Sequence, residues 1–145
     1  FAYASQQGFL VNKTIKENLS LFSSISISDG TIKKLLDRLN LYKVVNESGG
    51  INSVLLENGK NFSGGQRQRL SFASVLLSDR PVLIFDEITS NLDDETANIV
   101  EELIFEESKN KICLFITHRK LFNHPCTTLN FAKLSRSNIN NPTKN

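Results

Sequence analysis

The second half of the chain alternates between continuous apolar runs and a helix-like pattern. Residues 82–85 and 112–116 are uninterrupted apolar runs of strand length. Between them, residues 94–107 place apolar side chains at helical spacing, with Ile99, Leu103 and Ile104 predicted to face inward. The glutamates predicted to face outward are Glu101, Glu102 and Glu106. A strand, a helix and a second strand that is apolar throughout predict a βαβ unit in a parallel, covered sheet.

The first half is less regular but shows local start signals. Residues 1–3 are predicted to be the end of a strand, and residues 14–21 a short helix. A second helix is predicted to begin at Ser28, because apolar residues then follow at positions i, i+3, i+4 and i+7. These residues are Ile32, Leu35, Leu36 and Leu39. Residues 46–61 contain three glycines and are predicted to be a connecting loop.

Composition narrows the class of protein. The chain has 145 residues, 39% of them apolar and 22% charged, which is typical of one globular domain. The net charge of +2 does not indicate a nucleic-acid or lipid-headgroup surface, and no apolar run is long enough to span a bilayer. Two cysteines without a disulfide framework indicate a reducing compartment. Because the chain contains no methionine, we expect it to be a piece of a longer protein.

Polar side chains directly follow both apolar strands. Asp86 and Glu87 end the first strand, and His118 follows the second. Ligands of parallel sheets bind beyond the carboxyl ends of the strands, so these residues form a candidate site. One carboxylate could hold Mg²⁺ and its neighbour could orient a water molecule. Two alternatives stay open, namely a capping or solvated acidic pair and a histidine that only stabilises a hinge.

A second candidate site lies at the start of a predicted helix. Ser63 and Gln66 have the spacing of a capping box, and two glycines separate them. Each glycine costs about 1 kcal/mol in a helix relative to alanine. Bare amides at a helix N-terminus can bind an anion that side chains would exclude, which would explain the glycines. A simple N-cap explains Ser63 and Gln66 but leaves Gly64 and Gly65 unexplained.

Five segments, in this order, resemble the motifs of the nucleotide-binding domain of ABC transporters. Residues 4–6 (ASQ) are similar to the Q-loop. Residues 62–66 (FSGGQ) are similar to the signature motif, usually LSGGQ. Residues 82–87 (VLIFDE) resemble the Walker B strand with its catalytic glutamate. Residues 89–93 (TSNLD) resemble the D-loop, and residues 117–119 (THR) resemble the H-loop.

Three further segments resemble exporter-type members of this family. Residues 9–11 (FLV) and 14–19 (TIKENL) are similar to the segment that follows the Q-loop, and residues 57–59 (ENG) to the E-x-G stretch. The resemblance covers roughly residues 1–120. The glycine-rich phosphate loop with its lysine is absent, as is the aromatic residue placed against adenine. Residues 123–136 also depart from the family pattern.

The resemblance implies an α/β fold of the P-loop NTPase type, with a parallel sheet and an α-helical signature subdomain. It implies that residues 1–145 are the C-terminal portion of one ABC ATPase domain that lacks the phosphate loop. The Q-loop exit and helical subdomain would occupy about residues 12–80, and the core from Walker B to the H-loop about residues 81–131. Residues 135–145 are expected to be a disordered tail, because they are polar and have no apolar period.

By the same resemblance, the site residues fall into three groups. The implied catalytic residues are Glu87, His118 and Gln6. The implied nucleotide-binding residues are Ser63, Gly64, Gly65, Gln66 and Asp93. Mg²⁺ would be handled by Asp86 and Gln6.

The resemblance also implies ATP with Mg²⁺ as cofactors, and two such domains arranged head to tail. A transmembrane domain would be the other partner, which places the ATPase at the cytoplasmic face of a membrane. No nucleic-acid partner is expected. Without the phosphate loop, we expect the chain alone to show no measurable ATP hydrolysis.

Two rival functions remain. A soluble ABC ATPase acting on ribosomes or DNA would be expected to carry a coiled coil, a second cassette or a basic patch, and this sequence has none of them. A degenerate cassette that only dimerises would not need Glu87, His118 or the two signature glycines. The leading prediction is therefore the ATP-hydrolysing domain of a transporter, with export as the direction.

Overall fold

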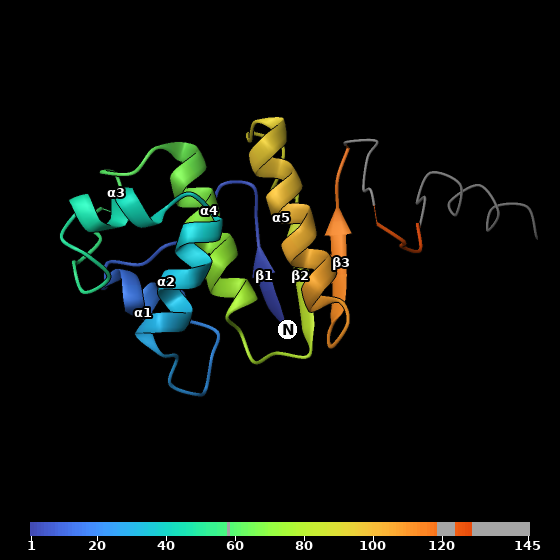
Figure 1. Ribbon diagram of the computed structural model, residues 1–145, viewed down its shortest axis with the longest axis horizontal. Coiled ribbons are helices and arrows are strands. Elements are labelled where there is room, and N and C mark those ends of the chain that lie inside the picture. Colours follow the sequence, from blue (N-terminus) through green and yellow to red (C-terminus); the bar gives the residue numbers. More distant parts are fainter. Residues whose placement is uncertain (58, 119–123, 129–145) are drawn as a thin grey trace, which may run out of the picture.

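Eight helices and strands make up the part of the chain that this computed structural model describes, residues 1–57, 59–118 and 124–128. In chain order they are β1 (Ala2–Ala4), α1 (Ile15–Leu19), α2 (Asp29–Arg38), α3 (Tyr42–Glu47), α4 (Gly64–Leu76), β2 (Val82–Asp86), α5 (Asp94–Glu107) and β3 (Ile112–Ile116). The three strands form one parallel sheet in the order β1-β2-β3 (Figure 1). The predicted βαβ unit is confirmed, because β2 and β3 pair in parallel and α5 connects them.

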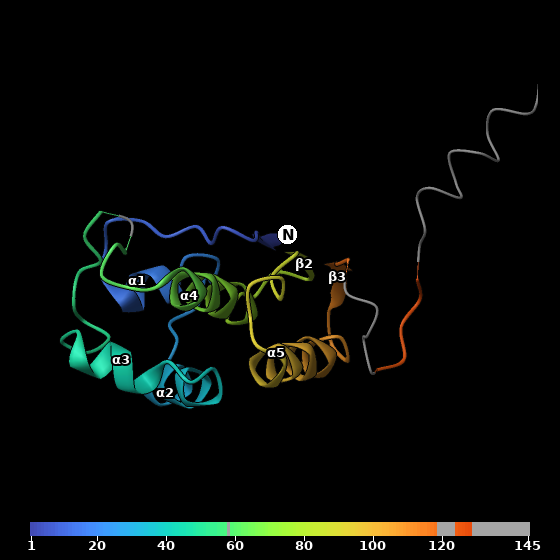
Figure 2. The same cartoon turned by 90° about the horizontal axis from the view of Figure 1, so that it is seen from above.

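Helices cover one face of the sheet. Seen from above, α5 lies beneath β2 and β3, and α4 passes beside β1 (Figure 2). Leu83 and Phe85 of β2 point into this layer and are fully buried, and the Phe85 ring packs against Phe72 of α4 at 5.4 Å between centroids. Helices α1, α2 and α3 gather on the side of β1 that faces away from β3 (Figure 1). The apolar core therefore runs from the sheet through α4 into the helical part.

The opposite face of the sheet is exposed at β3 among the described residues. The side chains of Ile112, Leu114 and Ile116 in β3 are 62%, 48% and 50% exposed. The prediction that both faces of the strands are buried is therefore wrong for β3, whereas the second face of β2 is half-buried. The apolar sequence of β3 is that of a doubly covered strand, but the described elements supply only one covering layer.

Helix starts follow local capping chemistry, as predicted. Ser28 caps α2 by accepting a hydrogen bond from the Thr31 amide, and Thr14 and Glu17 form a capping box at α1. The buried face of α2 includes Ile32 and Leu36. Because these bonds join residues three apart in the chain, the sequence alone locates the starts of α1 and α2 to within about one residue.

Two details differ from the prediction. Helix α3 begins at Tyr42, with no side chain capping it, and ends inside the segment expected to be a loop. Glu101 is only 5% exposed, although it was expected to face outward. It falls at helical spacing with Ala97, Val100 and Ile104, which form the buried stripe of α5. The face that α5 turns toward the core, rather than residue polarity, decides this burial.

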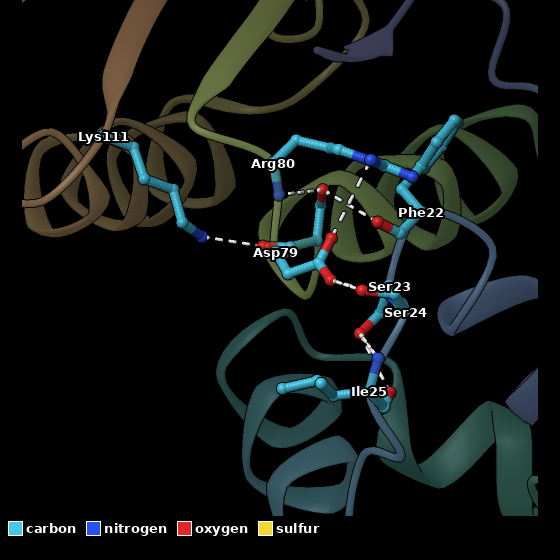
Figure 3. Close-up of polar contacts among 8 residues, drawn as sticks. Phe22, Ser23, Ser24, Ile25, Asp79, Arg80 and Lys111 are labelled. Carbon is cyan, nitrogen blue, oxygen red and sulfur yellow. Dashed lines mark hydrogen bonds and ion pairs between the residues drawn. The ribbon is translucent and has the colours of Figure 1, made fainter.

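Side-chain hydrogen bonds join the helical part to the sheet near the start of β2. The Asp79 carboxylate accepts hydrogen bonds from the Ser24 amide, at 2.9 Å, and from the Ser24 hydroxyl (Figure 3). These bonds lower the pKa of Asp79. Ser78 donates from its hydroxyl to the Phe22 carbonyl, and Lys111 donates to the Ser78 carbonyl at 2.8 Å. The loop between α1 and α2 is thus held against the connection between α4 and β2.

None of the described helices combines the length and apolar character that a membrane span requires. Some sequence predictions fall outside the described residues. These are the disordered tail at 135–145, the end of the predicted core at 129–131, Asn58 of the E-x-G stretch and Arg119 of the H-loop.

Candidate functional site

The carboxyl ends of β2 and β3 bring an acid and a histidine into contact. Glu87 Oε1 lies 2.9 Å from His118 Nε2. The Glu87 amide donates to the Ile116 carbonyl at 2.9 Å, which extends the pairing of the two strands by one residue. Glu87 itself has a φ of +50°, a left-handed conformation that non-glycine residues seldom adopt. This turn directs the side chain along the edge of the sheet toward β3.

The second acid of the pair is held from the neighbouring strand. Tyr3 of β1 donates a hydrogen bond from its hydroxyl to Asp86 Oδ2 at 2.8 Å. This bond raises the pKa of the Tyr3 phenol. A cleft of about 400 Å³ opens in front of Asp86 and Glu87, and Ser5, Gln6 and Gln7 line its other side. Asp86 and Glu87 therefore face a common polar space.

Gln6 connects the end of β1 to the loop that follows β2. Its side-chain amide donates to the Ser90 hydroxyl at 3.0 Å, and that hydroxyl donates to the Glu87 carbonyl at 2.8 Å. Gln6 also lines a second cleft, of about 510 Å³, together with Gly64, Arg67 and Asn91. The two clefts share Gln6 and Gln7 as lining residues, so the cleft at the strand-end acids and the cleft at the start of α4 are neighbours.

The start of α4 is a complete capping box with two bare glycines. The Ser63 hydroxyl accepts from the Gln66 amide at 3.2 Å, and the Gln66 side chain accepts from the Ser63 amide at 2.8 Å. The first-turn amides of Gly64 and Gly65 have no carbonyl partner within the helix. A Cβ at Gly64 would meet nothing within 4 Å, and one at Gly65 would meet only Leu92 Cδ2 at 3.8 Å. The fold therefore has room for side chains at both glycines.

Asp93 is occupied by a local contact. It caps α5, accepting from the Thr96 amide and the Thr96 hydroxyl, each at 2.9 Å. The hydrogen bond from the Thr96 amide is the largest of the causes that lower the pKa of Asp93. Both carboxylate oxygens of Asp93 are thus engaged by Thr96 in the first turn of α5.

Two residues of this region were not singled out from the sequence. Tyr3 contacts Asp86 from 83 residues away. Gln68 of α4 is 2% exposed, and its side-chain amide lies 3.4 Å from the Glu87 carbonyl. No sequence signal marks Gln68, because it lies in the polar run 66–69 (QRQR).

The donor set fits a hard divalent cation bound together with a phosphate ligand. Within the described ranges no group of three or more His, Cys, Asp or Glu side chains converges as a protein-only metal cage. Mg²⁺ is usually held by one or two carboxylates, with water and substrate phosphates completing the shell. Asp86 could supply such a carboxylate, and Gln6, which lines the same cleft, could supply an amide oxygen.

Comparison with known proteins matches the ABC transporter family description to residues 1–90. The chain is 40% identical over 116 residues to an ATP-dependent lipid A-core flippase of Francisella tularensis subsp. holarctica (strain OSU18), covering 79% of the chain and 19% of the flippase. It is 38% identical over 120 residues to the protein of the same name from Vibrio vulnificus (strain YJ016), covering 82% and 21%. The chain therefore spans about a fifth of the length of these curated relatives.

A solved structure supports the fold. The structure of a bacterial Atm1-family ABC exporter with ATP bound superposes with a TM-score of 0.68 at 24% identity. The match covers 81% of this chain and 21% of that one.

Proposed function

Because the chain belongs to the ABC transporter family, we propose that it is the C-terminal portion of an ATPase domain that powers export across a membrane. In this proposal, residues 12–80 form the Q-loop exit and helical subdomain, and residues 81–131 belong to the catalytic core. The remainder of the ATPase domain would cover the exposed apolar face of Ile112, Leu114 and Ile116. A transmembrane domain and a second ATPase domain, arranged head to tail, would be the partners.

The contact between Glu87 and His118 is the observation that carries the catalytic part of the proposal. At 2.9 Å, the imidazole can hold the carboxylate oriented toward the cleft. Glu87 would accept a proton from the attacking water, and His118 would donate a hydrogen bond to the γ-phosphate. General-base assistance of this kind contributes about 10²- to 10⁴-fold to a rate.

Phosphoryl transfer depends mainly on positioning and on stabilising charge, which fits the remaining residues. When bound, Mg²⁺ neutralises charge on the phosphate oxygens, and Asp86 with Gln6 would hold it. The open start of α4 would bind the γ-phosphate of a nucleotide that the facing domain holds. The residues involved would be Ser63, Gly64, Gly65 and Gln66. Asp93 would lie at the interface between the two domains, and its cap on α5 would fix the start of that helix.

The test is ATP hydrolysis by the full-length protein carrying Glu87→Gln. This change keeps the shape of the side chain and removes its basicity. We expect turnover to fall by about 10²- to 10⁴-fold while ATP still binds. Near-normal turnover would remove Glu87 from the role of general base. Lys60→Gln is a suitable control, because Lys60 is exposed and its ion-pair partner is Glu57 rather than a site residue.

A further inference from the structure

Tyr3 makes a side-chain contact at the site that the proposed function leaves unused. It lies in β1 opposite Ile84 of β2, so Asp86 is two residues further along the same face. The phenol reaches diagonally across to the neighbouring strand and donates a hydrogen bond to Asp86 Oδ2 at 2.8 Å. Tyr3 is 41% exposed on the uncovered face of the sheet, so burial of its ring does not by itself account for this fixed orientation.

The bond orients the carboxylate without neutralising it. In the part of the chain that the structure describes, the Tyr3 phenol donates a hydrogen bond to the Asp86 carboxylate. Because it engages Oδ2, Oδ1 is left for the cleft that Ser5, Gln6, Gln7 and Glu87 also line. A lysine or arginine in place of the phenol would compete with a bound cation, whereas a neutral phenol leaves the full negative charge of the carboxylate available.

We propose that Tyr3 is a positioning residue for the divalent cation that accompanies ATP. Its phenol holds the Asp86 carboxylate in the rotamer that presents one oxygen to the cleft. The proposal rests on the proposed function, which assigns Asp86 to the cation. Outer partners that orient a metal-binding side chain commonly change metal affinity by about 10- to 100-fold when removed. A single hydrogen bond that orients the carboxylate from an uncharged donor falls at or below the weak end of that range.

The test measures cation binding rather than turnover. Mn²⁺ replaces Mg²⁺, and its binding to the full-length protein with a non-hydrolysable ATP analogue is followed by loss of the free Mn²⁺ signal in electron paramagnetic resonance. Tyr3→Phe removes only the hydroxyl. We expect it to raise the apparent Mn²⁺ dissociation constant by about 3- to 10-fold. Tyr42→Phe is the matched control, because the chain has two tyrosines and Tyr42 contacts Lys33 away from the site. It should leave the constant unchanged.

The Asp86→Asn variant separates the two hypotheses. If Asp86→Asn weakens Mn²⁺ binding but Tyr3→Phe does not, Tyr3 is not a positioning residue and the proposed role of Asp86 stands. If neither change weakens binding, Asp86 does not meet the cation, and the proposed function fails at this residue together with the inference about Tyr3. In the double variant, Tyr3→Phe should add no further loss. Full additivity would show that Tyr3 acts independently of Asp86 and would overturn the inference.

Discussion

Replacing Gly65 by alanine should make the fold more stable and the protein less active. Gly65 is the second residue of α4, and a Cβ there would make only an ordinary contact with Leu92 Cδ2 at 3.8 Å. Alanine in a helix is more favourable than glycine by about 0.5–1 kcal/mol. For a chain of this size, that gain corresponds to a rise in Tm of roughly 2–4 °C.

The same methyl group would stand on the surface that an anion approaches at the start of α4. Losing one hydrogen bond to a charged group costs about 1.5–3 kcal/mol. At about 1.4 kcal/mol for each factor of ten, ATP hydrolysis by the full-length protein should fall by about 10- to 150-fold. The stability change is measured by thermal unfolding of the chain under far-ultraviolet circular dichroism, and the activity change by phosphate release.

Gly30 supplies a matched control within the same chain. It is also the second residue of a helix capped by serine, and its Cβ would meet only Ser28 Oγ at 3.8 Å. Gly30→Ala should give a similar gain in stability with no loss of activity. A Gly65→Ala protein that is more stable and fully active would show that the bare amide at this position is not needed to bind an anion.

Two further predictions concern protonation. Hydrogen bonds from Ser24 lower the pKa of Asp79, so the stability that its charge supplies is complete above about pH 5 and is lost as the pH falls below about 4. Asp79→Asn should therefore lower the urea denaturation midpoint at neutral pH, and the difference from the unchanged protein should shrink in acid. A difference that does not depend on pH would contradict this role of Asp79. Burial raises the pKa of the Cys113 thiol to about 11, whereas Cys126 is exposed. With each cysteine present alone, iodoacetamide should therefore alkylate Cys113 at least about ten times more slowly than Cys126 near neutral pH, and equal rates would show that Cys113 is not shielded.

The predictions that held from sequence alone depend on short-range chemistry. Ser63 and Gln66 are three residues apart, and their mutual hydrogen bonds form the capping box at the start of α4. The apolar run of β2 ends at Asp86 for an equally local reason, since the chain turns where its apolar residues stop. Parallel pairing then places the ends of β2 and β3 at one edge, which is why Glu87 and His118 could be expected to lie near one another.

The contacts that could not be predicted join residues far apart in the chain. Nothing near Tyr3 in the sequence indicates Asp86, because the pairing depends on the register of β1 against β2. Likewise, Glu101 is buried only because α5 turns that side toward its neighbours. Capping, strand length and turn position are local interactions that neighbouring residues determine. Side-chain orientation across strands and helix docking depend on packing between distant segments, and only the tertiary structure decides them.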